Sequence, residues 1–324
     1  MKGFLTTLLL LFAGALLLLG LRSLSAWDRE PPLWPRVVRA AEGTTIEVGK
    51  ELSILLEEPP IRVLPANAAL VDMVSALVPP ERIAALPRET EEYSRLGSEA
   101  GAWSALPTFR GFSAEALLVH TPDLVIAHAW QKPEVVALLR QEGIPVLVVP
   151  LPRRWEDVER TLALLGEVLD AEDAAATLQN DLDSRIAHLR SRVPAERRLA
   201  ALSYTNLGSG GWAAGRNTTA DVLFELAGLR NAAAGLEGFQ AMDLERLFSL
   251  DPDLIIVSAA RDGQDPNAQA PTAAYLYGER SLARLRAVRE HHIVALPPRL
   301  FTTTSHELLH CAEELVERIE QLGL

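Results

Sequence analysis

The segment His306-Glu307-Leu308-Leu309-His310 carries residue types that could do chemistry. On a helix, two histidines four positions apart share one face and could bind zinc, and Glu307 would then act as general base on a zinc-bound water. Two features count against this zinc metallopeptidase: 14 residues follow His310, and no third histidine stands at the extended-motif spacing. His306 and His310 are therefore kept as weak metal candidates only, and we expect no enzyme.

Other sites for catalysis or nucleic acid are not indicated. Ser209 lies between glycines but lacks the strand-to-helix elbow of a nucleophilic serine. The glycine-rich stretch 208–216 lacks the Gly-Lys-Ser/Thr of a phosphate-binding loop. The net charge is −12 and no basic cluster occurs, so nucleic acid is not an expected partner.

A duplicated stretch points to the elements that would position a site. Residues 113–126 read SAEALLVHTPDLVI and residues 243–256 read DLERLFSLDPDLII. Each copy begins with a helix-capping residue and carries a glutamate in the first turn, at Glu115 and Glu245. A Pro-Asp turn and an apolar run follow, as in a strand buried on both faces. Two such units predict two similar α/β lobes.

The segment between the copies predicts how the lobes are joined. Residues 155–192 contain no proline, and their apolar positions follow helical spacing, as one long helix or two abutting ones. The predicted fold is α/β, with two Rossmann-like parallel-sheet lobes joined by a single long helix and a ligand cleft between them. The predicted parts are a signal peptide or N-terminal anchor (1–26), a lead-in segment (27–57), an N-terminal lobe (58–154), a connecting helix (155–195) and a C-terminal lobe (196–324).

The N-terminus predicts export. An uncharged, leucine-rich run over residues 3–21 lies between Lys2 and Arg22, and small residues up to Ala26 follow it. This pattern fits a signal peptide cleaved before Trp27, and its length also fits an uncleaved membrane anchor. The sole cysteine, Cys311, excludes an intramolecular disulfide and leaves no N-terminal cysteine for lipid attachment.

The region 58–322 resembles the periplasmic substrate-binding proteins of ABC importers for iron chelates, haem and vitamin B12. This resemblance implies two α/β lobes joined by one long helix, and a monomer that gives its ligand to an ABC permease in the inner membrane. The ligand would be a small metal chelate, which brings the metal itself, so no cofactor is expected. The stretches that carry the resemblance are PPIRVLPAN (59–67), SAEALLVHTPDLVIAH (113–128), GIPVLVV (143–149), the helical segment 155–192, TTADVLFELAGLRNAAA (218–234) and DLERLFSLDPDLIIV (243–257).

The resemblance also suggests roles for individual residues. In the family, one glutamate per lobe meets arginines of the permease, and Glu115 and Glu245 match these positions. The ligand would lie against loops at the C-terminal ends of the strands. We expect the ligand-binding residues to be Asn67, Phe109, Arg110, His128 and Trp130 in the first lobe, and Tyr204, Trp212, Arg216, Phe239 and Phe301 in the second.

The nature of the ligand is the least determined prediction. Phe109 and Phe239 each lie six residues before a duplicated glutamate, and relatives that bind vitamin B12 pack aromatic residues at similar positions on the ligand. Haem-binding relatives often carry a tyrosine just before the stretch that matches Arg110, and Thr108 and Phe109 stand there instead. A cobalamin-like corrinoid is therefore slightly preferred. The alternatives are a ferric siderophore or haem, the zinc metallopeptidase, and a binding protein used for sensing without a permease.

Overall fold

The computed structural model describes residues 34–49, 52–98, 101–193, 199–206, 210–259 and 270–324. The predicted signal peptide or anchor lies outside these residues. Residues 35–324 form one compact unit. Over the ranges that the model describes, no helix is both long and apolar enough to cross a bilayer.

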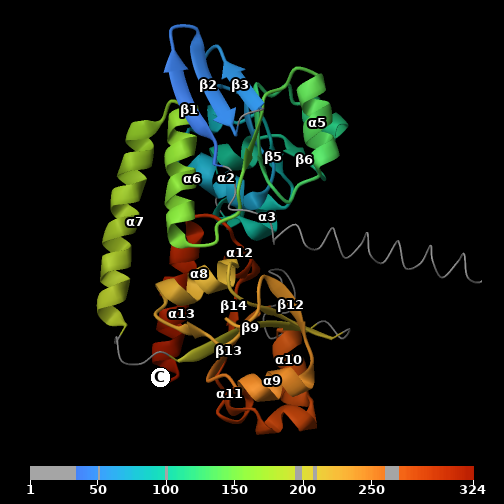
Figure 1. Cartoon of the computed structure of the whole chain (residues 1–324), viewed down its shortest axis with the longest axis vertical. Coiled ribbons are helices and arrows are strands. Elements are labelled where there is room, and N and C mark those ends of the chain that lie inside the picture. The colour runs from blue at the N-terminus through green and yellow to red at the C-terminus, as the bar shows by residue number, and fades with distance from the viewer. Residues whose placement is uncertain (1–33, 50–51, 99–100, 194–198, 207–209, 260–269) are drawn as a thin grey trace, which may run out of the picture. The chain divides into compact units, whose positions relative to one another are not determined.

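The described part of the lead-in forms a small antiparallel sheet, drawn in blue in Figure 1. Its strands are β1 (Arg36–Ala40), β2 (Gly43–Val48) and β3 (Leu52–Leu56). Ile46 is fully buried in the main core, and the Arg39 guanidinium donates to the Glu167 carbonyl oxygen at 3.1 Å. The lead-in is therefore packed onto the connecting helices.

The N-terminal lobe is built on a parallel sheet with the order β4-β7-β8. All five residues of the central strand β7 are buried, as the apolar run of the first duplicated stretch predicts. A second, two-stranded parallel pair, β5 with β6, lies in the same lobe. The elements are β4 (Val63–Pro65), α2 (Ala68–Ser75), β5 (Leu86–Pro87), α3 (Thr90–Tyr93), the 3-10 turn η3 (Arg95–Ser98), β6 (Thr108–Phe109), α4 (Ala114–Leu118), β7 (Leu124–His128), α5 (Pro133–Gln141) and β8 (Val146–Val149).

The C-terminal lobe is built on a mixed sheet with the order β12-β10-β9-β13-β14. Strands β9, β13 and β14 are parallel, whereas β10 and β12 form an antiparallel ribbon on the free side of β9. The ribbon begins at Gly211, and a larger residue would not fit there because a Cβ would lie 2.1 Å from the Tyr204 hydroxyl oxygen. The elements are β9 (Ala200–Asn206), β10 (Gly211–Ala214), α8 (Thr219–Leu226), β11 (Arg230–Asn231), β12 (Phe239–Met242), α9 (Leu244–Leu250), β13 (Leu254–Ser258), α10 (Pro271–Gly278), α11 (Arg286–Arg289), β14 (Ile293–Leu296), α12 (Pro298–Phe301) and α13 (Glu307–Gln321).

The two duplicated stretches form the same structure. Both helices, α4 and α9, are capped by the predicted side chains: Ser113 accepts from the Ala116 backbone N–H at 3.3 Å and Asp243 from the Arg246 N–H at 2.8 Å. The buried strands β7 and β13 follow. The predicted α/β class with two lobes is thus confirmed.

The aspartate of each Pro-Asp turn fixes the neighbouring strand. The Asp123 carboxylate accepts from the Ile61 backbone N–H at 2.7 Å, just before β4. The Asp253 carboxylate accepts from the Ala200 N–H at 2.8 Å, at the start of β9. Each lobe therefore uses the same side chain to set where its first strand enters the sheet.

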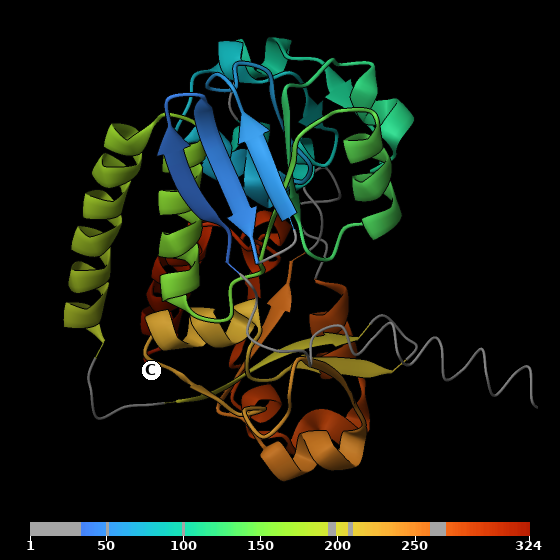
Figure 2. The same ribbon diagram turned by 45° about the horizontal axis from the view of Figure 1, so that its top comes forward.

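The connecting segment differs from the prediction of a single helix over 155–195. It forms two helices side by side, α6 (Trp155–Val168) and α7 (Glu172–Arg192), and α7 leads to the C-terminal lobe (Figure 2). The break falls at Asp170, whose φ of 52° lies in the left-handed region and ends the helical path. A Cβ at Gly166 would lie 2.7 Å from the Ala175 Cβ, so this glycine lets the two helices approach closely.

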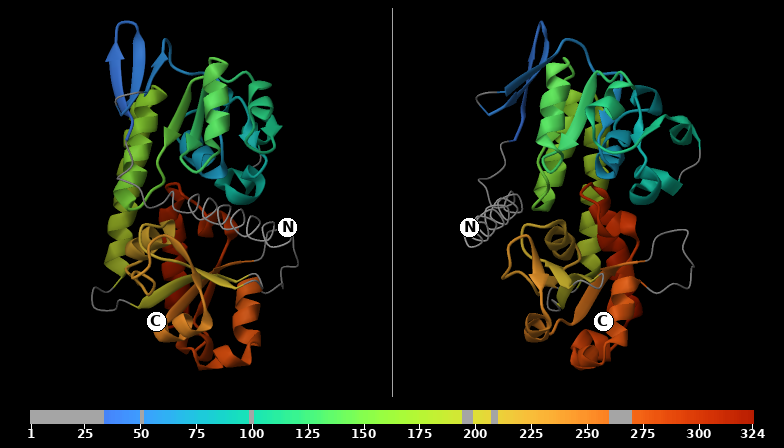
Figure 3. Two further views of the ribbon diagram at one scale, coloured as in Figure 1. Left: turned by 45° about the vertical axis from the view of Figure 1, so that its right-hand side comes forward. Right: turned by 90° about the vertical axis from the view of Figure 1, so that its right-hand side faces the viewer.

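One hydrophobic core runs through both lobes along these helices. It includes Ile126 of β7, Leu165 of α6, Leu189 of α7 and Ile256 of β13, all nearly or fully buried. The C-terminal helix α13 packs against both α7 and α8 (Figure 3). Because the apolar contacts are continuous from lobe to lobe, the connection resists large hinge motions.

Candidate ligand-binding site

A cavity of about 650 Å³ lies at the C-terminal ends of the N-terminal lobe strands. Its volume is in the range of ligand pockets, and its position agrees with the rule for parallel sheets. Among the described residues, the C-terminal lobe contributes the loop between α12 and α13. The lining residues are Ala66, Asn67, Ala68, Ala69, Glu89, Tyr93, Phe109, Gly111, Phe112, Trp130, Gln131 and Lys132 from the first lobe, and Thr302, Thr303 and Thr304 from the second.

The wall of the cavity behind Asn67 is a fixed, uncharged network. The Asn67 Oδ1 accepts from the Leu70 N–H at 3.1 Å and so caps α2, while its Nδ2 donates to His128 Nδ1 at 3.0 Å. Gln131 donates to the Ala66 carbonyl oxygen at 3.0 Å. Burial lowers the pKa of His128 to about 3, so the imidazole is neutral. His128 therefore supports the wall rather than lining it.

The exposed part of the wall is mostly apolar and aromatic. Phe109 is 5% exposed and forms part of the floor, whereas Trp130 is 59% exposed at the edge. The charged lining residues are Glu89 and Lys132, which carry opposite signs, and none of the described lining residues is an arginine. The cavity therefore suits a ligand with an apolar face and little net charge.

Three of the ten predicted ligand-binding residues line this cavity: Asn67, Phe109 and Trp130. Arg110 is exposed beside Phe109 but does not line the cavity. Phe301 is half-buried and packs against the main core, although the three threonines directly after it line the cavity. The predicted residues of these segments therefore lie in the loops around the cavity more often than in its lining.

The candidates of the C-terminal lobe lie outside the cavity for different reasons. Tyr204 is 1% exposed and belongs to the core of its lobe, where its hydroxyl accepts from Asn206 at 3.3 Å, and its predicted ligand contact stays a prediction. Arg216 is engaged by Glu237, with Nε and Oε2 2.5 Å apart. Both side chains have internal partners that sequence spacing does not reveal.

Trp212 and Phe239 form an exposed aromatic pair on the β10–β12 ribbon. Trp212 is paired with Ala241 and Phe239 with Ala214, so the two aromatic side chains lie on the same face of the ribbon. They are 46% and 49% exposed. Neither lines the cavity, and their predicted contact with ligand stays a prediction.

The two duplicated glutamates are exposed at the starts of their helices. Glu115 lies in the first turn of α4 and Glu245 in the first turn of α9. Hydrogen bonds from the backbone at the helix start and from the Ser113 hydroxyl lower the pKa of Glu115. Both carboxylates are free to meet a partner protein, and their predicted docking role stays a prediction.

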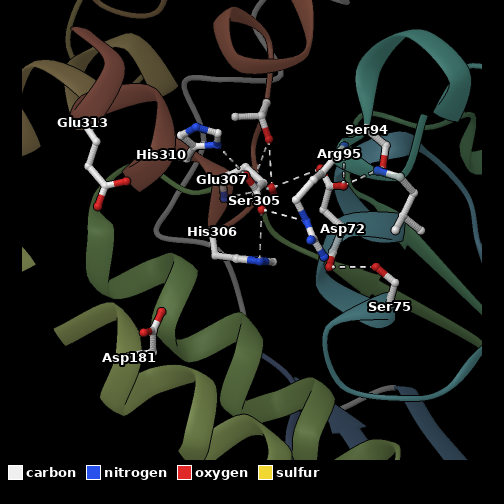
Figure 4. Close-up of polar contacts among 12 residues, drawn as sticks. Asp72, Ser75, Ser94, Arg95, Asp181, Ser305, His306, Glu307, His310 and Glu313 are labelled. Carbon is white, nitrogen blue, oxygen red and sulfur yellow. Dashed lines mark hydrogen bonds and ion pairs between the residues drawn. The ribbon is translucent and has the colours of Figure 1, made fainter. Parts of the chain in front are cut away.

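The structure does not support the zinc motif. His306 is the residue directly before α13 and is 6% exposed, whereas the His310 side chain is about half exposed. Glu307 lies between them, 3.6 Å from His306 Nε2 and 3.3 Å from His310 Nδ1 (Figure 4). Within the described residues, no group of three or more His, Cys, Asp or Glu side chains could hold a metal ion. The weak metal role of this pair therefore stays a prediction.

Several lining residues were not among the predicted ones. Tyr93 lies in a stretch of short turns without periodicity, and Gln131 reaches the wall by hydrogen bonds to β4 and β7. The threonines 302–304 follow strand β14 after one short helix. The sequence feature that could have identified the three threonines is their position beyond the C-terminal end of a strand.

Comparisons with known proteins agree with this architecture. Residues 74–300 match the family model described as periplasmic binding protein. The chain is similar to an uncharacterized ABC transporter substrate-binding lipoprotein, YvrC, of Bacillus subtilis (strain 168), with 23% identity over 64% of this chain. That match spans 65% of the length of the relative.

Solved structures share the fold at low identity. The periplasmic haem-binding protein RhuT from Roseiflexus sp. RS-1, in apo form, is 21% identical, with a TM-score of 0.68 over 81% of this chain and 99% of that chain. An ABC-type Fe3+-hydroxamate transport system protein from Saccharomonospora viridis is 23% identical, with a TM-score of 0.66 over 84% and 96%. The family model covers well over half of the chain. The chain therefore belongs to the periplasmic binding protein family, and it is a binding protein rather than an enzyme.

Proposed function

We propose that the protein captures a metal chelate outside the cytoplasm and delivers it to the permease of an ABC importer. The observation that carries this proposal is the aromatic-lined cavity at the strand ends, with walls from both lobes. The leucine-rich N-terminal run and the name of the Bacillus subtilis relative support export. The solved relatives named for haem and for Fe3+-hydroxamate support the chelate class.

The nearly neutral lining favours a chelate without strong net charge. Glu89 and Lys132 offset each other, and Arg216 is already paired with Glu237. A polyanionic chelate would lose its hydration in such a cavity and would meet Lys132 as the sole cation of the described lining, beside the opposing charge of Glu89. A corrinoid or an uncharged ferric hydroxamate meets this requirement, and we keep the corrinoid as the first candidate.

The size of the cavity restricts how a corrinoid would bind. A cavity of about 650 Å³ encloses a drug-sized ligand, and a corrinoid with its nucleotide arm is larger. One face of the ring would lie on Phe109 and Trp130, and the remainder would extend toward the C-terminal lobe. The exposed pair Trp212 and Phe239 offers aromatic surface for that remainder.

Haem is a second candidate because Tyr93 lines the cavity. A tyrosine oxygen is an established ligand of ferric haem iron in proteins. The sequence argument against haem concerned the residues beside Arg110, and Tyr93 lies well before them in the chain. Tyr93→Phe would therefore separate the two candidates: it changes the absorbance spectrum of a haem complex and leaves corrinoid binding unaltered.

The test is a titration of the purified protein with cyanocobalamin, hemin and ferrioxamine B, followed by absorbance and by thermal unfolding. A bound ligand raises the unfolding temperature in proportion to the logarithm of its concentration over Kd. Trp130→Ala should weaken the binding at least tenfold, whereas Tyr277→Ala, which removes an exposed aromatic of α10, should leave it unchanged. Absence of a response to all three chelates would refute the proposal.

A further inference from the structure

A buried polar network follows directly in sequence after the three threonines that line the cavity, and Figure 4 shows its side chains. Its centre is Ser305, whose side chain is fully buried. The Ser305 hydroxyl lies 2.9 Å from the Thr303 hydroxyl, accepts from the Glu307 N–H at 3.2 Å and donates to Asp72 Oδ2 at 3.5 Å. One side chain thus contacts the cavity wall, the start of α13 and helix α2 of the other lobe.

Asp72 is held firmly on the N-terminal lobe side. It is 3% exposed, and its Oδ1 accepts from the Ser94 hydroxyl at 2.5 Å and from the Arg95 backbone N–H at 3.1 Å. The other oxygen is the one that faces Ser305. The carboxylate therefore joins α2 and η3 of its own lobe to the loop that precedes α13.

A second link between the lobes lies beside the first. The Arg95 Nε lies 3.4 Å from Glu307 Oε1, and Glu307 in turn contacts both histidines of its segment. His306 is buried, and its Nδ1 has no hydrogen-bond partner among the residues that the structure describes. The charged and titratable groups that face this network are Asp72 from α2, Arg95 from η3, Arg185 from α7, and His306, Glu307, His310, Glu313 and Glu314 from the start of α13.

We propose that Ser305 and Asp72 are positioning residues for the ligand cavity: they form an interlobe latch that holds the threonine wall against the N-terminal lobe. The proposal rests on the proposed function in that the cavity is taken as the ligand site. The ligand would contact Thr303, and Thr303 is fixed by Ser305, which is fixed by Asp72. Opening of the lobes at this point breaks the chain of hydroxyl contacts and displaces the wall.

The two buried titratable groups, Asp72 and His306, make the stability of the latched form depend on pH in opposite directions. Burial raises the pKa of Asp72 to about 7, and separation of the lobes would return the pKa toward 3.8, so the latched form gains stability as the pH falls through 7. Burial lowers the pKa of His306 to about 4, and exposure would return the pKa toward 6.5, so the latched form loses stability as the pH falls below 6.5. In the native chain these two pH dependences offset each other.

The test measures the distance between the lobes without a ligand. Spin labels on Glu134→Cys in α5 and Ser249→Cys in α9, both exposed positions, report the lobe separation by double electron–electron resonance. The native chain should give one narrow distance from pH 5 to pH 8. Ser305→Ala should add a second, longer distance. Thr218→Ala, which removes a buried hydroxyl that caps α8 within one lobe, is the matched control and should keep the single distance.

The pH profile distinguishes a latch from a merely structural role. In Asp72→Asn, the population of the longer distance relative to the shorter one should increase about tenfold per pH unit as the pH falls from 6.5 toward 5, because His306 is then the one of the two buried groups that still titrates. In His306→Gln, the same population ratio should increase by the same factor per pH unit as the pH rises from 5 to 7, because Asp72 is then the group of the two that still titrates. Equal distances in Ser305→Ala and Thr218→Ala, or pH-independent profiles in both charge variants, would overturn the proposal.

Ligand affinity completes the test and separates it from the proposed function. For the chelate that the titration identifies, Ser305→Ala should weaken binding about tenfold and Thr218→Ala should not. If none of the three chelates binds, the proposed function fails while the distances still decide the latch. If a chelate binds and the distances do not change, the latch fails and the proposed function stands.

Discussion

The two lobes differ most where their duplicated strands end. Strand β7 of the first lobe ends at His128, and the residues just beyond it line the cavity. The equivalent strand β13 of the second lobe ends at Ser258, and the described residues of that lobe that line the cavity come instead from the loop between α12 and α13. The duplicated units thus build two similar frames, and the unduplicated loops build the site.

Phe109 and Phe239 show how far the pseudo-symmetry extends. Both precede their glutamate by six residues, yet Phe109 is 5% exposed and Phe239 is 49% exposed. Phe109 ends a strand of a parallel pair and packs in the cavity floor, whereas Phe239 begins an edge strand of the antiparallel ribbon. Equal spacing in sequence therefore does not give equal environments once the sheets differ.

The largest expected effect on stability tests this difference between Phe109 and Phe239. Phe109→Ala removes a buried ring and should lower the free energy of unfolding by about 3–5 kcal/mol, while Phe239→Ala should lower it by less than about 1 kcal/mol. Urea denaturation followed by circular dichroism measures both. Equal losses would mean that the two rings are equally packed, and the lobes would then be more alike than the structure indicates.

The next effect concerns His128, whose counterpart in the second lobe, Ser258, does not titrate. Burial lowers the pKa of His128 to about 3 from an unfolded value of 6.5. The unfolded chain therefore binds a proton that the folded chain does not, so this contribution is complete above pH 6.5 and is lost as the pH falls toward 3. At pH 4.5 the loss is about 2–3 kcal/mol.

The variant His128→Gln tests that contribution. It keeps a side chain that can accept from Asn67 and removes the titration, so the stability of the variant should fall less steeply with acid than that of the native chain. The measurement is the urea midpoint from pH 4.5 to pH 7.5, with His188→Gln, on the surface of α7, as the control. Parallel pH profiles for the native chain and the His128 variant would contradict the buried neutral imidazole.

Much of the frame could be predicted from the sequence because it depends on local patterns. The helix caps at Ser113 and Asp243 and the buried strands that follow are encoded within each duplicated stretch. The position of the break at Asp170 was not predictable from periodicity, because apolar positions at helical spacing occur on both sides of it. Tyr93 and Ser305 take their roles from contacts with distant segments, which no spacing in the chain records.

A smaller effect would compare the two Pro-Asp turns. Asp123→Ala removes the acceptor for the backbone before β4, and Asp253→Ala does the same before β9. Hydrogen bonds to a charged group stabilise by about 1.5–3 kcal/mol when desolvated, and both carboxylates are half-buried, so each substitution should cost about 1–2 kcal/mol. Asp123 also accepts from the Arg62 N–H at 3.0 Å, and Asp253 also pairs with Arg286, so the two losses should be similar. Negligible losses by urea denaturation would show that other contacts fix the strand entrances.

The smallest effect on the folded protein is expected at Glu115 and Glu245, where the two lobes are most alike. Both are exposed, so Glu115→Arg with Glu245→Arg should leave the denaturation midpoint and the chelate affinity unchanged. The predicted docking role requires that uptake of the chelate by cells is nevertheless lost, because a reversed charge would repel the permease arginines that the prediction places opposite the glutamates. Glu134→Arg with Glu225→Arg, at exposed positions of α5 and α8, reverses the same charges on other helices of the two lobes, and this matched control should retain uptake. If the double variant still supports full uptake, the duplicated glutamates serve only their helix starts, and the symmetry of the lobes carries no docking function.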